Sequence, residues 1–142
     1  MLGAFSAMNI AASGLSAQRV RMNTIASNLA NARTTRTESG EMYRRIDPVF
    51  TSKNVGGLSF GPRPKGVSEV TVDHLVQDQR AGQMVHDPQH PDANQDGYVQ
   101  LPNIHVVEEM VNMITASRAY EAGISSIESV KSMARSAVEI GG

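Results

Sequence analysis

Apolar residues recur every three or four positions at both ends of the chain, over residues 5–30 and residues 103–140. Near the N-terminus a seven-residue rhythm is carried by Met8, Leu15, Met22 and Leu29, with Ala4, Ala11 and Ile25 on the neighbouring row. Near the C-terminus the row is formed by Val106, Met110, Met113, Ser117, Tyr120, Ile124, Ile127, Ala134 and Val138. Steps of four and three residues keep such a row on one side of a helix. The pattern predicts two long helices that each pack lengthwise.

The expected helices cover residues 5–31 and residues 103–140, which makes them roughly 40 and 55 Å long. Asn103 follows a proline and is expected to be the N-cap of the second helix. Glu108 and Glu109 come soon after it, where the positive end of the helix dipole favours acids. The second helix therefore has a well-marked start, and Gly123 is its one weak position.

The segment between the two ends has no helical rhythm and contains most of the glycine and proline. Residues 43–50 are expected to form a short strand interrupted by a proline, and residues 54–66 a Gly- and Pro-rich loop. Alternating valines predict a strand over residues 67–76. Residues 83–86 and 98–101 are expected to add two short strands around a turn. The middle of the chain is therefore a small, irregular β-containing segment.

The N-terminal segment carries only two charged residues, Arg19 and Arg21, among many Ala, Ser and Asn. A surface helix normally has a charged outer face, so these small side chains favour close packing against several neighbours. Such a helix is marginal alone in water, and we expect the isolated monomer to be less helical than its two segments imply. The C-terminal segment carries more acids than bases, which favours pairing of the two helices within or between subunits.

Bulk composition excludes several classes of function. The absence of cysteine removes any disulfide framework, thiol nucleophile or Cys-based zinc site. A net charge of −1 gives no bulk attraction to nucleic acid or to anionic membranes, and we expect neither as a partner. No apolar run is long enough for a transmembrane helix, and the first basic residues follow the first apolar stretch, unlike in a signal peptide.

One stretch has the spacing of the first half of an EF-hand calcium loop. It places Asp92, Asn94 and Asp96 at alternate positions, followed by Gly97. The twelfth position is Asn103 instead of the bidentate Glu, and prolines precede the stretch where an incoming helix is needed. The simpler interpretation is an Asx-rich turn that leads into a short strand, and a calcium-binding module stays as a third-ranked alternative.

Catalysis has no support in the sequence. His86 and His90 have the spacing of two metal ligands on a helix, but the proline between them argues against that helix. No phosphate-binding loop, zinc-protease motif or nucleophile elbow occurs. Arg44 and Arg45 are interpreted as a solvated basic spot. We expect no enzymatic activity, no cofactor and no metal.

Several motifs resemble those of the bacterial flagellar rod and hook proteins. The N-terminal ones are AASGLSAQ at residues 11–18 and NTIASNLANA at residues 23–32. The C-terminal ones narrow the resemblance to the proximal rod proteins, and they are HPDAN at residues 90–94, GYV at 97–99, VVEEMV at 106–111, ASRAYEA at 116–122 and KSM at 131–133. The resemblance covers nearly the whole chain, with about residues 52–82 generic.

This resemblance implies a structural subunit of the basal-body rod, the drive shaft that crosses the periplasm and transmits torque. The terminal helices of such proteins pack into a tube around the export channel. The implied partners are copies of the chain itself, other rod proteins, the junction protein between rod and membrane ring, and the flagellar type III export apparatus. Export through that apparatus needs no cleaved signal peptide.

The fold class expected is mainly α, with two terminal helices packed as an extended coiled-coil-like unit around the β-containing middle. The expected divisions are residues 1–31, 32–101 and 102–142. The assembly interface is expected to comprise Phe5, Met8, Leu15, Met22, Ile25, Asn28, Leu29, Asn31, Met110, Met113, Tyr120, Ile124, Ile127 and Val138. Of these, Asn28 and Asn31 are expected to cap or bridge the end of the first helix.

Two consequences separate a polymer subunit from the alternatives. On the interpretation above, Ile25→Asp or Ile127→Asp blocks assembly and motility but leaves expression intact. The runner-up is a self-contained helical hairpin that binds one partner. A type III needle component is a related variant, although needle subunits lack a β-containing middle.

Overall fold

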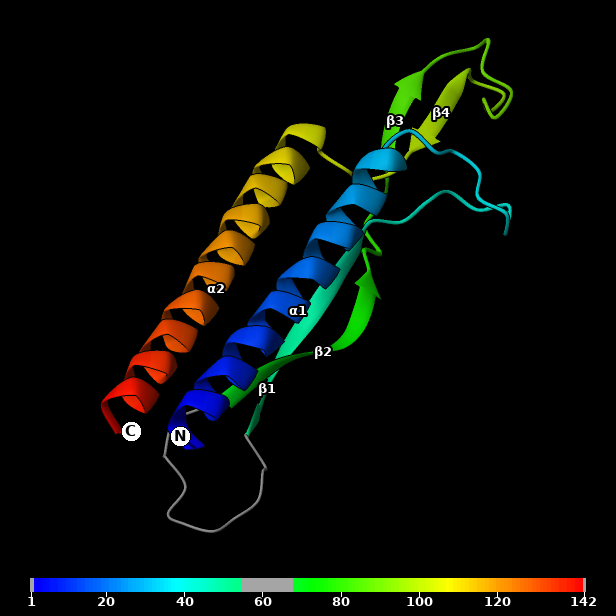
Figure 1. Ribbon diagram of the computed structural model, residues 1–142. Helices are drawn as coiled ribbons and strands as arrows, with labels where there is room; N and C mark the ends of the chain where they lie inside the picture. Colours follow the sequence, from blue (N-terminus) through cyan, green and yellow to red (C-terminus); the bar gives the residue numbers. More distant parts are fainter. Residues whose placement is uncertain (1, 55–67, 142) are drawn as a thin grey trace.

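The computed structural model describes residues 2–54 and 68–141. Two long helices dominate it, α1 (Leu2–Ala30) and α2 (Val106–Gly141), and they run antiparallel side by side so that both termini lie at one end (Figure 1). Along the described part of the chain, four strands lie between the helices. The expected mainly α fold with a small β-containing middle is confirmed, whereas the loop expected at residues 54–66 lies almost wholly outside the described residues.

The contact between the two helices is narrow and is lined by small side chains. Ala17 and Ile25 of α1 and Ala116 of α2 are buried there. Gly123 allows a close approach, because a Cβ added to it would lie 2.7 Å from Cδ2 of Leu15. The glycine that weakens α2 by propensity therefore makes room for a leucine of α1.

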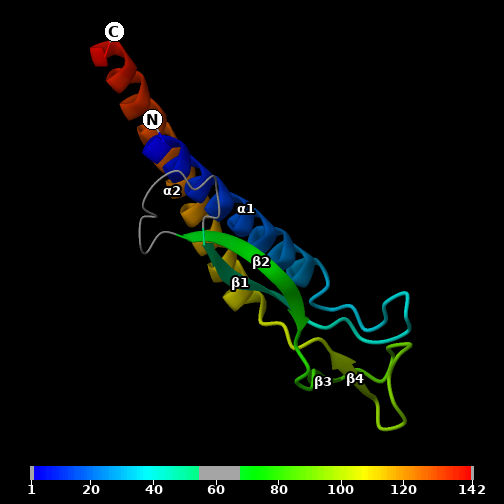
Figure 2. The ribbon, with the colours of Figure 1, turned by 90° about the horizontal axis from the view of Figure 1, so that it is seen from below.

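Strands β1 (Ile46–Asn54) and β2 (Ser68–Gln77) form an antiparallel pair that lies along α1 (Figures 1 and 2). The first strand was expected over residues 43–50 with an interruption at Pro48, but it runs from Ile46 through the proline to Asn54. In a two-stranded sheet each strand has an open edge, so the N–H that Pro48 lacks need not be one that bonds to β2. The expected strand over residues 67–76 is confirmed as β2.

Strands β3 (Gln83–His86) and β4 (Tyr98–Leu101) form a hairpin beyond the C-terminal end of α1, at the residues expected from the sequence. The left-handed backbone of Gly97, with a φ of 77°, closes the turn between them. The ring of His86 packs edge-to-face on that of Tyr98, with 5.0 Å between the ring centroids. The hairpin is a separate element from β1–β2.

The expected N-cap of α2 is wrong. The helix begins at Val106, and the first turn is closed by a 3.0 Å hydrogen bond from the Glu109 amide to the His105 carbonyl. Asn103 lies two positions before His105, which occupies the cap position, and its side-chain amide donates to Asp78, at 3.2 Å. That bond ties the start of α2 to the end of β2. Within the described residues, neither helix combines the length and apolar character that crossing a bilayer requires.

Candidate assembly interface

A buried polar junction fixes the end of α1, the start of β1 and the first turn of α2. At its centre Asn28 is fully buried, and its side-chain amide donates to the carbonyl of Ile46 and accepts from the amide of Ile46, both at 2.9 Å. The Tyr43 hydroxyl donates to Oδ1 of Asn28. The side-chain NH2 group of Asn28 also donates to Oε2 of Glu109, at 3.3 Å. One side chain therefore connects all three elements.

The charge of Glu109 is held inside this junction by Arg45. The glutamate side chain is 1% exposed, and the Arg45 guanidinium donates to its Oε1 at 2.7 Å. Burial lowers the pKa of Arg45, but the hydrogen bond to Glu109 and the charges of Asp47 and Glu109 outweigh it and raise that pKa. A buried carboxylate needs such a partner, because it is costly when left alone. Arg45 is therefore a structural residue, and its interpretation as solvated surface is wrong.

The chain after α1 turns through a second asparagine. The Asn31 amide donates to the Ser27 carbonyl at 2.9 Å, and its Oδ1 accepts from the Thr34 hydroxyl at 3.1 Å. Asn31 therefore caps the end of α1 while Asn28 bridges it to β1 and α2. Both roles expected for these asparagines are confirmed within a single chain.

The first two turns of α2 expose an apolar outward face. Its members are Val107, Met110, Val111 and Ile114, which are 54–75% exposed and share one side of the helix at steps of three and four. The opposite side of the same turns carries buried Glu109 and Ala116, so this face points away from α1. An apolar stripe that the described residues leave open is typical of a protein–protein contact.

A second open apolar surface lies at the far end of the bundle, where both termini are. It is a groove of about 420 Å³ between the start of α1 and the end of α2. The small side chains of Ala4, Ala7, Ala134 and Ala137 line it, and Met133, Val138 and Ile140 nearby are 55–87% exposed. Both ends of the helix pair therefore present apolar surface to a neighbour.

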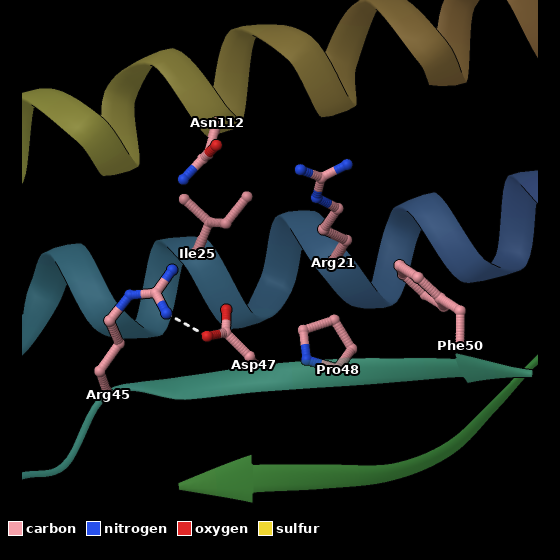
Figure 3. A pocket seen from close by; sticks show the side chains of 7 residues that line it. All are labelled: Arg21, Ile25, Arg45, Asp47, Pro48, Phe50 and Asn112. Carbon is pink, nitrogen blue, oxygen red and sulfur yellow. Dashed lines mark hydrogen bonds and ion pairs between the residues drawn. The ribbon is translucent and has the colours of Figure 1, made fainter. Parts of the chain in front are cut away.

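A third feature is a hollow of about 350 Å³ between α1, α2 and β1. Figure 3 shows Ile25, Pro48 and Phe50 as its apolar walls, with two guanidinium groups, those of Arg21 and Arg45, inside it. Arg45 turns to the carboxylate of Asp47, whereas Arg21 forms no ion pair among the described residues. The hollow thus combines apolar walls with the ion pair of Arg45 and Asp47 and with a second guanidinium, that of Arg21, which has no ion pair among the described residues.

The stretch that resembles half of an EF-hand has other bonding partners. The Asp92 carboxylate accepts from the Thr35 hydroxyl at 2.7 Å and pairs with Arg36. The hydrogen bond from Thr35 and the nearby charge of Arg36 lower the pKa of Asp92. The side-chain oxygen of Asn94 accepts from two backbone amides of the turn, as an Asx-rich turn requires. The turn interpretation is confirmed, and its carboxylate latches the hairpin to the loop after α1.

The two candidate metal ligands are likewise engaged elsewhere. The His86 ring packs on Tyr98, and Nδ1 of His90 accepts from the Asp92 amide at 3.0 Å. Across residues 2–54 and 68–141 no three ligating side chains gather closely enough to hold a metal ion.

Comparison with known proteins decides between the interpretations of this geometry. A family model described as "Flagella basal body rod protein" matches residues 8–36, and one described as "Flagellar basal body rod FlgEFG protein C-terminal" matches residues 95–140. The curated flagellar basal-body rod protein FlgC of Borreliella burgdorferi is 42% identical over 98% of both chains. The chain belongs to the FlgC family. FlgC of Bacillus subtilis is 40% identical over 97% of this chain and 98% of its own, and that of Aquifex aeolicus 42% identical over 92% of both.

Membership of the FlgC family makes the chain a structural rod subunit of the flagellar basal body. It favours that role over the self-contained hairpin binding protein. The family is one of structural proteins and not of enzymes. The two matched regions cover most of α1 and α2, which are the helices that carry the open apolar surfaces.

The interface residues expected from the sequence fall into three groups in this FlgC-family chain. Ile25 and Asn28 are buried within the chain. Those that are half-buried are Met8, Leu15, Met22, Leu29, Asn31, Met113, Tyr120 and Ile127. Those that are exposed are Phe5, Met110, Ile124 and Val138. The exposed group is available to a neighbour as it stands, and the set as a whole remains a prediction.

The placement of Ile25 changes what its substitution tests. Its side chain is 5% exposed and faces Asn112 of α2 in the hollow. An aspartate there places a charge inside the helix contact of one chain. Ile25→Asp therefore tests folding before it tests assembly, which corrects the reasoning from the sequence.

Sequence reasoning missed Val107, Val111 and Ile114, although a signal was present. These three residues follow the same four–three spacing as the expected row, one position further along the helix. Two adjacent apolar rows on one helix indicate two faces that need cover. The row of Val107, Val111 and Ile114 lies on the outward face together with Met110, whereas the expected row is half-buried at Met113, Tyr120 and Ile127.

Proposed function

We propose that the chain polymerises through α1 and α2 into the tubular proximal rod, encloses the export channel and transmits torque. The helices of neighbouring subunits pack lengthwise in the manner of a coiled coil, so that torque is shared among many small contacts. Its partners are copies of itself, other rod proteins and the junction protein between rod and membrane ring. The rod spans the periplasm, and the subunit reaches it through the type III apparatus without a cleaved signal peptide.

One observation carries this proposal. The outward face of α2 (Val107, Met110, Val111 and Ile114) is apolar and uncovered by the described parts of its own chain. Burying a single large aliphatic side chain contributes about 1.5–3 kcal/mol, so four such residues can hold a lasting contact. A heterologous contact that does not close generates a helical tube.

The test introduces a charge on the outward face without touching the core. Ile114→Asp, produced in a flagellated strain that lacks the chain, is expected to abolish swimming and rod formation. The circular dichroism of the purified variant is expected to match that of the starting protein, because Ile114 is 58% exposed. Ser132→Asp, an equal charge at an exposed polar position of α2, is the matched control and is expected to swim.

Normal rods with Ile114→Asp contradict the role of this face. Ile25→Asp supplies the contrast, since it is expected to lower the stability of the monomer itself. The two aspartate variants therefore separate loss of assembly from loss of folding.

A further inference from the structure

The two helices carry complementary charges that are not matched within one chain. α1 has the bases Arg19 and Arg21 and no acid, whereas Glu121, Glu128 and Glu139 of α2 are exposed. Although the helices lie side by side, no ion pair between them occurs in the described part of the chain. If the bases of α1 pair with the acids of α2, as the charge asymmetry predicts, they do so between subunits.

The two arginines of the hollow differ in what holds them. Arg45 is paired with both Asp47 and Glu109. Arg21 is half-buried beside the apolar walls, and no carboxylate of residues 2–54 or 68–141 lies within ion-pair distance of it. An opposite charge brought into such a partly desolvated site interacts more strongly than on an open surface.

The outward side of α2 offers a matching set of side chains. Val107, Ile114, Glu121 and Glu128 follow one another at steps of seven, so they form one row along the helix. Two apolar residues come first and two acids follow. The hollow offers a complement to each part of this row. Pro48 and Phe50 are apolar walls for the apolar residues, and the Arg21 guanidinium is a base for an acid.

We infer that the hollow of one copy receives the outward row of α2 from a second copy, with Glu121 of that copy pairing with Arg21. Glu121 is the acid next to the apolar pair, so one helix laid across the hollow brings apolar residues to the walls and a carboxylate to the guanidinium. Two different surfaces meet in this contact, so it is heterologous and can repeat from copy to copy. The inference rests on the proposed function, since it names the partner of the same assembly.

The experiment is a charge exchange in a flagellated strain that lacks the chain. Arg21→Glu is expected to reduce the number of assembled basal bodies by at least about tenfold, because like charges placed together are strongly unfavourable. The double variant Arg21→Glu with Glu121→Arg is expected to restore most of them. Arg19→Glu makes the same charge change on an exposed position of α1 and is expected to assemble normally.

Folding is checked separately, by thermal unfolding of each purified variant. Arg21 has no ion pair within the described chain, so losing its charge is not expected to lower the unfolding temperature. Arg21→Glu also brings a carboxylate into the hollow that Asp47 lines. If it does unfold earlier, Arg21→Gln, which keeps the length and loses the charge, is compared in its place and is expected to reduce assembly.

Three results overturn the inference. The first is normal assembly with Arg21→Glu or its Gln counterpart. The second is a defect that neither Glu121→Arg nor Glu128→Arg relieves, which assigns Arg21 to a chain other than a second copy. The third is a defect that Glu128→Arg relieves and Glu121→Arg does not, which makes Glu128 the partner of Arg21. Failure of the unsubstituted chain to restore swimming contradicts the proposed function instead, so the two failures are distinguishable.

Discussion

The side chain of Asn28 hydrogen-bonds the backbone of Ile46 as a neighbouring β-strand would. It donates to the Ile46 carbonyl and accepts from the Ile46 amide, both at 2.9 Å. A helix cannot itself offer β-ladder partners, because its interior backbone groups are already bonded. The asparagine therefore lets a strand begin directly against the last turn of α1, and it fixes the angle between helix and sheet.

Replacing Asn28 is expected to weaken the folded chain strongly. Asn28→Leu keeps the approximate volume but leaves the amide and carbonyl of Ile46 without their partner, and each buried group left unsatisfied costs about 1–3 kcal/mol. We expect the free energy of unfolding in urea to fall by about 3 kcal/mol. Asn23→Leu, on an exposed position of α1, is the control and is expected to change it little. Equal losses for the two variants contradict the junction.

The ion pair of Glu109 and Arg45 is expected to show the behaviour of a buried pair. Glu109→Leu removes the buried partner of a guanidinium that is only 17% exposed and leaves it Asp47 alone, so the loss is expected to be toward the lower end of the about 3–5 kcal/mol that breaking a buried pair costs. Adding Arg45→Met to it is expected to recover much of that stability, because an apolar pair of similar volume needs no charge partner.

Urea denaturation of both variants and of Glu108→Leu, at the exposed neighbouring position, measures this difference. A double variant that is no more stable than Glu109→Leu alone contradicts the importance of the pair. A large loss for Glu108→Leu points instead to the helix dipole, which both glutamates share.

Two glycines in the helices are expected to respond oppositely to alanine. A Cβ at Gly123 lies 2.7 Å from Leu15 Cδ2, so Gly123→Ala forces the Leu15 side chain to shift at a cost of about 1–3 kcal/mol, against a gain of about 1 kcal/mol in helix propensity. A Cβ at Gly14 meets nothing within 4 Å, so Gly14→Ala keeps the gain alone. Thermal unfolding is expected to rise for Gly14→Ala and to stay level or fall for Gly123→Ala. Equal stabilisation by both contradicts the close approach at Gly123.

Local spacing predicted the elements of this fold better than it predicted their contacts. The limits of β3 and β4 follow from turn residues on either side, and the rhythm of α1 and α2 marks both helices. Spacing cannot show whether a row of apolar residues packs inside its own chain or against a neighbouring subunit. Buried Ile25 and exposed Met110 were therefore both assigned to the assembly interface. The pairing of Arg45 with Glu109 spans 64 residues of sequence, and no local pattern connects them.

The expected N-cap of α2 failed for the same reason. Asn103 has the residue type and the preceding proline of an N-cap, yet the helix begins at Val106 and the side-chain amide of Asn103 donates to Asp78, which follows a distant strand. The local preference, worth about 1 kcal/mol, is thus too small to set where the helix starts. A prediction of a helix from periodicity is less sensitive to a single tertiary contact, because it depends on a whole row of residues instead of one.

Acid is expected to destabilise the chain through two aspartates. Hydrogen bonds from Arg80 lower the pKa of Asp78 far below its ordinary value of 3.8, and the hydrogen bond from Thr35 lowers that of Asp92. A carboxyl group whose pKa is lower in the folded state binds its proton more readily when the chain is unfolded. Its contribution is therefore complete above about pH 4 and is lost as the pH falls toward the folded value.

Thermal unfolding followed from about pH 6 to pH 2 is expected to show a steady fall below pH 4. Asp92→Asn removes the titrating group and the pairing with Arg36, so this variant is expected to start lower at pH 6 and to decline less steeply. Asp87→Asn, at an exposed aspartate of the same hairpin, is the control and is expected to follow the unsubstituted curve. If the slope of Asp92→Asn equals that of the unsubstituted chain, the latch between Asp92 and the loop after α1 contributes nothing to folding.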